Sequence, residues 1–556
     1  MRVALDWDRD AGIIACMTDF RGEQGATGAQ ESGKSRQGRL DECGMPIAKR
    51  VPTKRVFHGD TFIDEYEWLR DKESQDVQDY VAAQNRYCEQ RMEALKNLRT
   101  TLFDEFKSHV QETDMSVPTR MDGYWYFTRT KEGQQYAVQC RVPIRGADDW
   151  DPPTIEIGVP MDGEQVVFDT NAEAQGHDFF RVGGMDISKD GRWMLYGTDT
   201  SGDERYDFRI RNIETGDELP EVFEGIGGAC FTPDAQWVFY VLLDDAWRPY
   251  AVMRHRVGTP ITDDVEVYRE QDERFWVGIG LSFDERNLVI GTGSKTTTEV
   301  LLLSTDDPEG EFRAFIPREP DVEYDVSFSR FEGAGEHGED IPLAVVYHNA
   351  LNPNFEIDVI DMRSHEPPYR LGEGVRVAVG SPYGCEHGDD VEPGASSMPI
   401  GTPYSNPCNP AILQGAHGLG IEGISIHRHY VALQYRAESL AHIAVMTKDA
   451  AAEDFLAGRP WRFTELVPHA LEGDWDVDES VDEINVERAE VWGALDQLAA
   501  AQGEGSAVHG ISRKAMTSSD GATADAMPGE TRRLYSIGLG GNPSYDAPRI
   551  RYSFAS

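Results

Sequence analysis

The sequence has few cysteines and lacks long apolar runs. Its seven cysteines are scattered, odd in number and form no C-x-x-C pair, which argues against a disulfide framework and fits a reducing cytoplasm. No apolar run approaches the roughly 18 residues needed to span a membrane. Asp6, Asp8 and Arg9 interrupt any apolar core of a secretory signal. We therefore expect a cytoplasmic protein that has no membrane partner.

Positive charge is also scarce. The chain carries 53 lysines and arginines against 98 aspartates and glutamates, a formal net charge of −45 with a pI near 4.6. A phosphate backbone would be repelled, so we expect no nucleic-acid partner. The acidity either aids solubility or attracts basic substrates, and composition alone favours solubility.

A repeated pattern organises the segment from Met185 to Ser304. An Asp-led turn, an aromatic and β-branched run, another turn and a second run recur three times, with marker residues Asp190, Asp234 and Asp284 spaced 44 and 50 residues apart. Such a period, with several strands per repeat, predicts a β-propeller whose blades need neighbours to cover their faces. Trp193 and Trp237 recur in register with the repeat, so we expect them in the blade core.

The flanking segments divide the chain into three parts. Residues 1–44 look like an unstructured extension, and either Met1 or Met45 could start the protein. Residues 45–115 form an extended and helical segment, with a helix from about Ser74 to Glu112 and Ser74 as N-cap. Residues 116–556 form the propeller, interrupted by insertions at about 380–420 and 485–530. The second insertion contains a predicted short helix over residues 486–501.

Several motifs together resemble one peptidase family. They are Asp64-Glu-Tyr-Glu-Trp-Leu-Arg-Asp71, Glu112-Thr-Asp-Met-Ser-Val-Pro-Thr-Arg120, Gly202-Asp-Glu-Arg-Tyr206 and Gly540-Gly-Asn-Pro-Ser-Tyr-Asp-Ala-Pro548. Their order is similar to that of the prolyl oligopeptidase family, and most of all to its oligopeptidase B, or protease II, type. The resemblance covers about Met45 to Ser556 apart from the two insertions.

This resemblance implies an all-β fold, a seven-bladed propeller that need not be perfect, preceded by the helical segment. Family members join such a propeller to an α/β-hydrolase domain with a Ser-Asp-His triad. The propeller restricts access to short peptides, and oligopeptidase B resemblance implies cleavage after arginine or lysine. The helical segment of the family packs on the hydrolase.

The catalytic domain itself is not found in the sequence. A nucleophile elbow needs G-x-S-x-G because the serine occupies a strained turn that tolerates only small neighbours. The Gly-x-Ser sequences at Gly33, Gly394, Gly423 and Gly510 all lack the final glycine. The triad positions of the family would fall beyond Ser556. We therefore predict no catalytic residue, no cofactor and no metal site in this chain.

Three other groups of residues contain side chains that can ligate metals. The acidic run Asp474–Asp482 resembles a calcium loop but has Glu479 where glycine is needed, so a solvated acidic turn is favoured. His427 and His429 share one face if residues 423–433 form a strand, but they lack a third ligand. Cys385 and Cys408, with His387 and His417, could ligate zinc, but their spacings fit no standard zinc pattern.

Two functions remain open. The chain is the propeller part of an oligopeptidase B-like serine peptidase, not catalytic alone, which either acts with a separate α/β-hydrolase chain or derives from an interrupted gene. Alternatively, it is a freestanding binding module, because a fold does not determine function. Without a hydrolase, the apolar residues Leu95, Leu98, Leu102 and Phe106 would be exposed, which is unfavourable for a soluble monomer.

Overall fold

The computed structural model describes residues 39–40, 44–353, 355–379, 420–437, 440–459, 461–468, 490–491, 511–512 and 536–555. The chain divides into two compact units, Met1–Gln111 and Glu112–Ser556. The predicted insertion at 380–420 falls almost entirely outside the described residues, as do most of residues 1–44 and of the second insertion.

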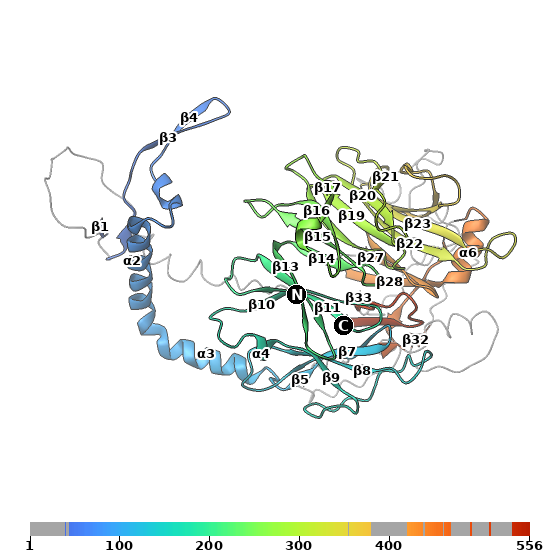
Figure 1. Ribbon diagram of the computed structural model, residues 1–556, viewed down its shortest axis with the longest axis horizontal. Coiled ribbons are helices and arrows are strands. Elements are labelled where there is room, and N and C mark those ends of the chain that lie inside the picture. Colours follow the sequence, from blue (N-terminus) through green and yellow to red (C-terminus); the bar gives the residue numbers. More distant parts are fainter. Residues whose placement is uncertain are drawn as a thin grey trace, which may run out of the picture. The chain divides into compact units, whose positions relative to one another are not determined.

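The first unit consists of two small hairpins and a helical segment, drawn in blue in Figure 1. Its strands are β1 (Arg39–Leu40), β2 (Pro46–Ile47), β3 (Thr53–Phe57) and β4 (Asp60–Asp64), and its helices are η1 (Glu67–Arg70), α2 (Gln75–Met92), η2 (Glu93–Leu95) and α3 (Lys96–Ser108). The helix predicted from about Ser74 to Glu112 is confirmed over residues 75–108, with a break at η2. The Ser74 hydroxyl accepts a hydrogen bond from the Val77 amide at 3.4 Å, so the predicted N-cap is also confirmed.

The second unit is a ring of four-stranded antiparallel blades that follow one another along the chain (Figure 1). Blade 1 has an inner strand in two pieces, β5 and β6, and the other blades each use four consecutive strands. The strands of blades 1 to 3 are β5 (Asp114–Met115), β6 (Thr119–Met121), β7 (Tyr124–Thr130), β8 (Val138–Pro143), β9 (Gln165–Asp169), β10 (Arg181–Ile187), β11 (Trp193–Asp199), β12 (Tyr206–Asn212), β13 (Glu218–Ile226), β14 (Gly228–Phe231), β15 (Trp237–Leu243), β16 (Pro249–Arg256) and β17 (Val265–Arg269).

Blades 4 to 6 continue the same order. Their strands are β18 (Trp276–Leu281), β19 (Asn287–Gly293), β20 (Thr298–Ser304), β21 (Arg313–Ile316), β22 (Tyr324–Phe331), β23 (Ile341–His348), β24 (Glu356–Asp361), β25 (Val375–Val379), β26 (Gly420–Ile426), β27 (Tyr430–Ala437), β28 (Leu440–Thr447) and β29 (Thr464–Glu465). The short helices of this unit are α4 (Thr170–Glu173), η3 (Ile261–Asp263) and α6 (Lys448–Leu456).

Side chains from facing blades form the core. Leu195 and Phe208 of blade 2, for example, pack with Val238 and Tyr240 of blade 3 in one buried cluster. Burying both faces of each sheet requires a neighbour on each side, which explains why the repeat occurs in consecutive copies. Trp193 and Trp237 are partly buried at the margins of such clusters.

The seven-bladed ring is confirmed only in part, because six complete blades are described. A smaller sheet, in the order β31 (Glu490–Val491), β34 (Ile550–Ala555) and β33 (Ser536–Leu539), packs against blade 6 through Ile537, Ile550 and Tyr552. On its other side, Arg549 donates to the Trp150 carbonyl of the connection after β8 at 2.7 Å. This sheet therefore lies between blade 6 and blade 1.

The second insertion corrects one prediction. Residues 490–491, expected within a helix, are strand β31, because their backbone pairs with β34. A two-residue strand, β32 (Ile511–Ser512), pairs with β30 (Val467–Pro468). Every pairing among the described strands is antiparallel, so the described part of the chain contains no parallel sheet of the hydrolase type. None of the described helices combines the length and apolarity that a membrane crossing requires.

Candidate functional site

The repeated turns join the first and second strands of blades 2 to 4 and owe their shape to one hydrogen-bond pattern. In blade 2, the Ser188 hydroxyl donates to Asp190 at 2.7 Å and accepts from the Trp193 amide at 2.9 Å. Thr232 with Asp234, and Ser282 with Asp284, repeat this arrangement. The side chains satisfy backbone groups that the turn leaves unpaired. The marker aspartates are thus turn-forming residues.

These turns close one end of the ring, which we name the closed end. It is formed by the connections between first and second strands, at residues 122–123, 188–192, 232–236, 282–286, 332–340, 427–429 and 540–549. Phe283 of blade 4 lies edge-on to His427 of blade 6, with ring centroids 4.9 Å apart, and to Tyr545 of the small sheet, at 5.8 Å. Lys189 of blade 2 pairs with Glu285 of blade 4. These contacts join blades that are not neighbours, so they reach across this end of the ring.

A buried lysine supports the closed end. Lys448, the first residue of α6, donates to the Ser329 hydroxyl at 2.6 Å and to the His427 carbonyl at 2.9 Å. The Tyr545 hydroxyl lies 2.9 Å from the same Ser329 oxygen. Burial lowers the pKa of Lys448 to about 7, and burial also lowers the pKa of His427 to about 4, because both charged forms lose hydration.

The opposite end, which we name the open end, is formed by the connections between second and third strands, at residues 131–137, 200–205, 244–248, 294–297 and 349–355. A cavity of about 710 Å³ lies there between blades 2, 3 and 4. Trp247 and Trp276 line it with 50% and 60% of their surface exposed. Its wall includes Gly228 and Gly278 of the inner strands β14 and β18.

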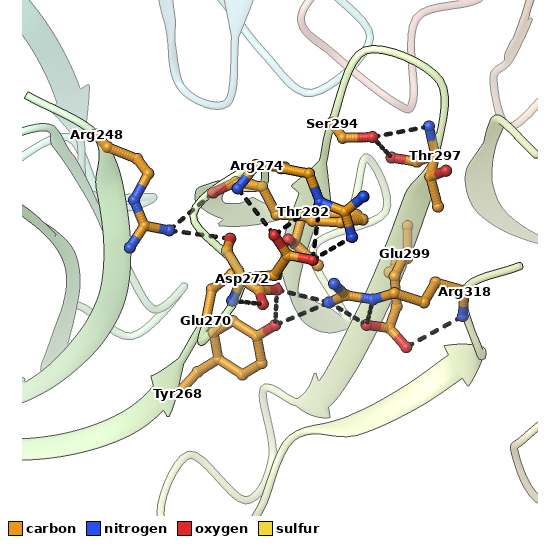
Figure 2. Close-up of polar contacts among 12 residues, drawn as sticks. Arg248, Tyr268, Glu270, Asp272, Arg274, Thr292, Ser294, Thr297, Glu299 and Arg318 are labelled. Carbon is orange, nitrogen blue, oxygen red and sulfur yellow. Dashed lines mark hydrogen bonds and ion pairs between the residues drawn. The ribbon is translucent and has the colours of Figure 1, made fainter. Parts of the chain in front are cut away.

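A network of charged residues joins blades 3 and 4 at the open end (Figure 2). Arg318 donates to Glu270 at 2.6 Å and to Glu299 at 2.7 Å, and its guanidinium lies 4.0 Å from the ring centre of Phe275. Burial alone would raise the pKa of Glu270, but hydrogen bonds, chiefly from Arg318, lower it. The connection from blade 3 to blade 4 is therefore held in place immediately before Trp276.

Arg248 holds the turn that carries Trp247 in place. It follows Trp247 in the turn of blade 3 and donates to the carbonyls of Asp272 and Phe275, at 3.2 and 3.1 Å. Its guanidinium also pairs with Asp244 in its own turn at 3.1 Å. Figure 2 shows Arg248 beside Asp272. This one side chain thus joins the turn that carries Trp247 to the segment immediately before Trp276.

Among the described residues, one buried group has the composition of a metal site. Donor atoms of His348, Glu356 and Asp358 lie within 4.8 Å of one another. The His348 Nε2 atom is 3.0 Å from Asp358 Oδ2, and Arg376 donates to Glu356 at 3.2 Å. The imidazole pairs with Asp358 and the guanidinium pairs with Glu356, while His348 Nδ1 and Asp358 Oδ1 are buried without a hydrogen-bond partner. The three residues meet across β23 and β24, a spacing that resembles no short metal motif.

The histidines considered from the sequence occupy a turn instead of a single continuous strand. His427 and His429 fall between β26 and β27. His427 is buried and stacks on Tyr430 with centroids 4.3 Å apart, whereas His429 is exposed. Asp474–Asp482, Cys385, Cys408, His387 and His417 lie outside the described residues. Of the four Gly-x-Ser serines, Ser425 and Ser512 are in strands β26 and β32, and the other two lie outside the described residues.

The sequence analysis did not predict which residues form the closed end or the open end. Trp247, Trp276 and Lys448 carry no local motif, and Phe283 lies in the third repeated turn at a position that the pattern leaves undefined. The available signal was the glycine content of the inner strands, including Gly228 and Gly278, which marks places where a strand lacks side chains.

The fold defines a β-propeller whose closed end is bridged by contacts between blades that are not neighbours and whose open end holds a cavity. Residues 46–332, just over half of the chain, match the N-terminal β-propeller domain of prolyl oligopeptidase. The chain therefore belongs to the prolyl oligopeptidase family.

Sequence relatives agree with this assignment. Dipeptidyl aminopeptidase BI of Pseudoxanthomonas mexicana is 35% identical over 283 residues, which cover 50% of this chain and 39% of that protein. Protease 2 of Moraxella lacunata is 28% identical over 312 residues, which cover 55% and 42% of the two chains. The chain thus spans about two fifths of the length of these curated relatives.

Solved structures share the fold. Oligopeptidase B from Trypanosoma brucei, in a closed form with covalently bound antipain, has a TM-score of 0.56 at 24% identity, covering 72% of this chain and 51% of that one. Oligopeptidase B from Leishmania major has a TM-score of 0.59 at 22% identity, covering 76% and 53%.

Proposed function

We propose that this chain is the propeller part of a serine peptidase similar to oligopeptidase B. The propeller would limit access to an α/β-hydrolase domain, and the enzyme would cleave short peptides after arginine or lysine. The observation that carries this proposal is the asymmetry of the ring, because Phe283, His427 and Tyr545 meet across one end and a cavity lies at the other. Membership of a peptidase family supports it.

The asymmetry gives the propeller a physical means of selection. At the closed end, a chain could pass only by separating packed rings and the Lys189–Glu285 pair. At the open end, a short peptide meets a cavity of about 710 Å³. Size selection therefore needs no recognition of sequence.

A hydrolase partner would also explain why apolar side chains are exposed on the helical segment of the first unit. None of the residues of α3 is buried, and Leu98, Phe103 and Phe106 are more than half exposed. Leu95 is exposed as well, and Leu102 is intermediate. Large exposed apolar side chains on one helical segment are typical of a contact surface. A stable, monodisperse monomer would instead favour the freestanding binding module.

Turnover measurements test the proposal. The purified chain should neither hydrolyse arginyl-aminomethylcoumarin peptides nor react with a fluorophosphonate probe. Mixed with the hydrolase part of the Moraxella lacunata relative, it should restrict cleavage to short peptides. Hydrolysis by the chain alone would refute the non-catalytic role.

A variant at the closed end tests the gate. Phe283→Ala should let the mixture cleave longer peptides, because it removes the ring that touches both His427 and Tyr545. The exposed Phe179→Ala, in the connection between blades 1 and 2, is the control. An unchanged length limit in Phe283→Ala would refute gating at this end.

A further inference from the structure

We propose that the open-end cavity binds the cationic side chain of a basic residue in a short peptide. This rests on the proposed function and assigns the binding of substrate to named residues of the propeller. The argument depends on the chemistry of the wall, on its rigidity and on the space left by the glycines.

The wall of the cavity is aromatic and acidic. Trp247 and Trp276 are exposed, and Asp203 and Glu204 supply two carboxylates. No lysine, arginine or histidine is among the fourteen described residues that line it. Tryptophan faces attract guanidinium and ammonium groups. The Arg205 guanidinium of the chain itself lies 5.7 Å from the centre of the Trp247 ring and pairs with Asp203 at 2.8 Å. A ligand cation would therefore take the place of Arg205 at this ring.

Both carboxylates of the cavity already pair with arginines of the chain, in exposed ion pairs that a cationic ligand can replace. Hydrogen bonds from Ser201, from the Arg205 amide and from the Arg205 guanidinium lower the pKa of Asp203, so it is charged at neutral pH. It pairs with Arg205 at 2.8 Å, with side-chain exposures of 36% and 52%. Glu204 pairs with Arg181 at 3.1 Å, with side-chain exposures of 67% and 51%. A pair this exposed contributes little, and a cationic ligand can exchange for Arg181 at small cost.

The backbone holds these side chains in uncommon conformations. Glu204 and Trp247 have φ values of 62° and 61°, the left-handed region that favours glycine. A bulky residue persists there only where its surroundings enforce it, and such positions concentrate at functional sites. Arg248 fixes the turn of Trp247 to the segment before Trp276, so both rings are positioned before a ligand arrives.

The glycines provide the space. A Cβ atom added to Gly228 would meet no atom within 4 Å, and one added to Gly278 would meet only the Gly291 carbonyl oxygen at 4.0 Å. Because β14 and β18 are inner edge strands, a peptide can approach their backbone closely at these positions. A valine at either position should fill the cavity while leaving the fold intact.

Calorimetric titration of the full chain tests this site. The probes are the blocked pentapeptide Ala-Ala-Arg-Ala-Ala and its citrulline counterpart, which keeps the shape of arginine without its charge. The arginine peptide should bind at least about tenfold more tightly than the citrulline peptide, because cation–π and charge contacts vanish with the charge. Equal affinities, or no binding of the arginine peptide at millimolar concentration, would overturn the proposal.

Variants locate the binding. Trp247→Gly and Gly278→Val should each weaken binding of the arginine peptide by about fivefold or more, and Gly228→Val is an independent second filling variant. Glycine suits the left-handed position of Trp247, so that variant should fold. Val265→Ala, an exposed apolar change on β17, and Glu214→Gln, an exposed acidic change distant in the fold, are the controls. Unchanged affinity in both valine variants would overturn the site.

The binding measurements and the test of the proposed function can fail independently of each other. Hydrolysis by the chain alone would refute the non-catalytic role while leaving the binding measurements valid. Conversely, equal binding of the two peptides would remove the site while leaving the gating test unaffected.

Discussion

Replacing the buried Lys448 by methionine should change how the stability of the propeller depends on pH. Lys448 is 5% exposed, and burial lowers its pKa from 10.5 to about 7. Between these values the unfolded chain holds a proton that the folded chain lacks, so the free energy of unfolding rises with pH. Below pH 7 Lys448 is protonated in both states, so it no longer makes the free energy of unfolding change with pH.

The magnitude follows from the pH interval. Each pH unit between the two pKa values is worth about 1.4 kcal/mol, so Lys448 should stabilise wild type by about 4 kcal/mol at pH 10 relative to pH 7. Methionine has a similar length and no proton, so Lys448→Met lacks this gain. The variant also loses the hydrogen bonds to Ser329 and the His427 carbonyl. Losing these bonds lowers the free energy of unfolding of the variant by the same amount at both pH values, so it does not alter the pH dependence.

Chemical denaturation followed by circular dichroism at pH 7 and pH 10 measures the difference. Comparing wild type with Lys448→Met at each pH cancels the contributions of all other groups. The exposed Lys295→Met, in the turn between β19 and β20, is the control and should show no such pH dependence. A wild-type advantage that is equal at the two pH values would refute the assignment of Lys448 as a lysine that is neutral when folded.

Three further predictions concern other parts of the ring. Because burial lowers the pKa of His427 to about 4, wild type should lose about 3 kcal/mol of stability as the pH falls from 6.5 to 4; His427→Phe should remove that loss in acid denaturation. Ala235→Gly should stabilise by about 0.5 to 1 kcal/mol in thermal melts, because Ala235 has φ 53° in the repeated turn; Ala229→Gly, in strand β14, should destabilise instead. Arg318→Met should destabilise by about 3 kcal/mol in urea, since Glu270 and Glu299 lose their cation; equal stability would show that the network contributes nothing.

The propeller could be predicted from the sequence because each turn and each strand is formed by residues that are neighbours in the chain. Asp190, Asp234 and Asp284 shape turns within a few residues, and alternating apolar runs define the strands between them. The N-cap at Ser74 has the same origin. The helix predicted over 486–501 is wrong at residues 490–491, because pairing with β34 overrides local preference.

The tertiary structure alone decided both ends of the ring. Phe283, His427 and Tyr545 are far apart in the sequence, and only closing the ring brings them together. Trp247 and Trp276 belong to different blades, and Arg248 and Arg318 hold their segments together. Local pattern specifies each blade, since a strand and its turn are formed by neighbouring residues. Contacts between blades depend on the radius and curvature of the whole ring, which no single repeat encodes.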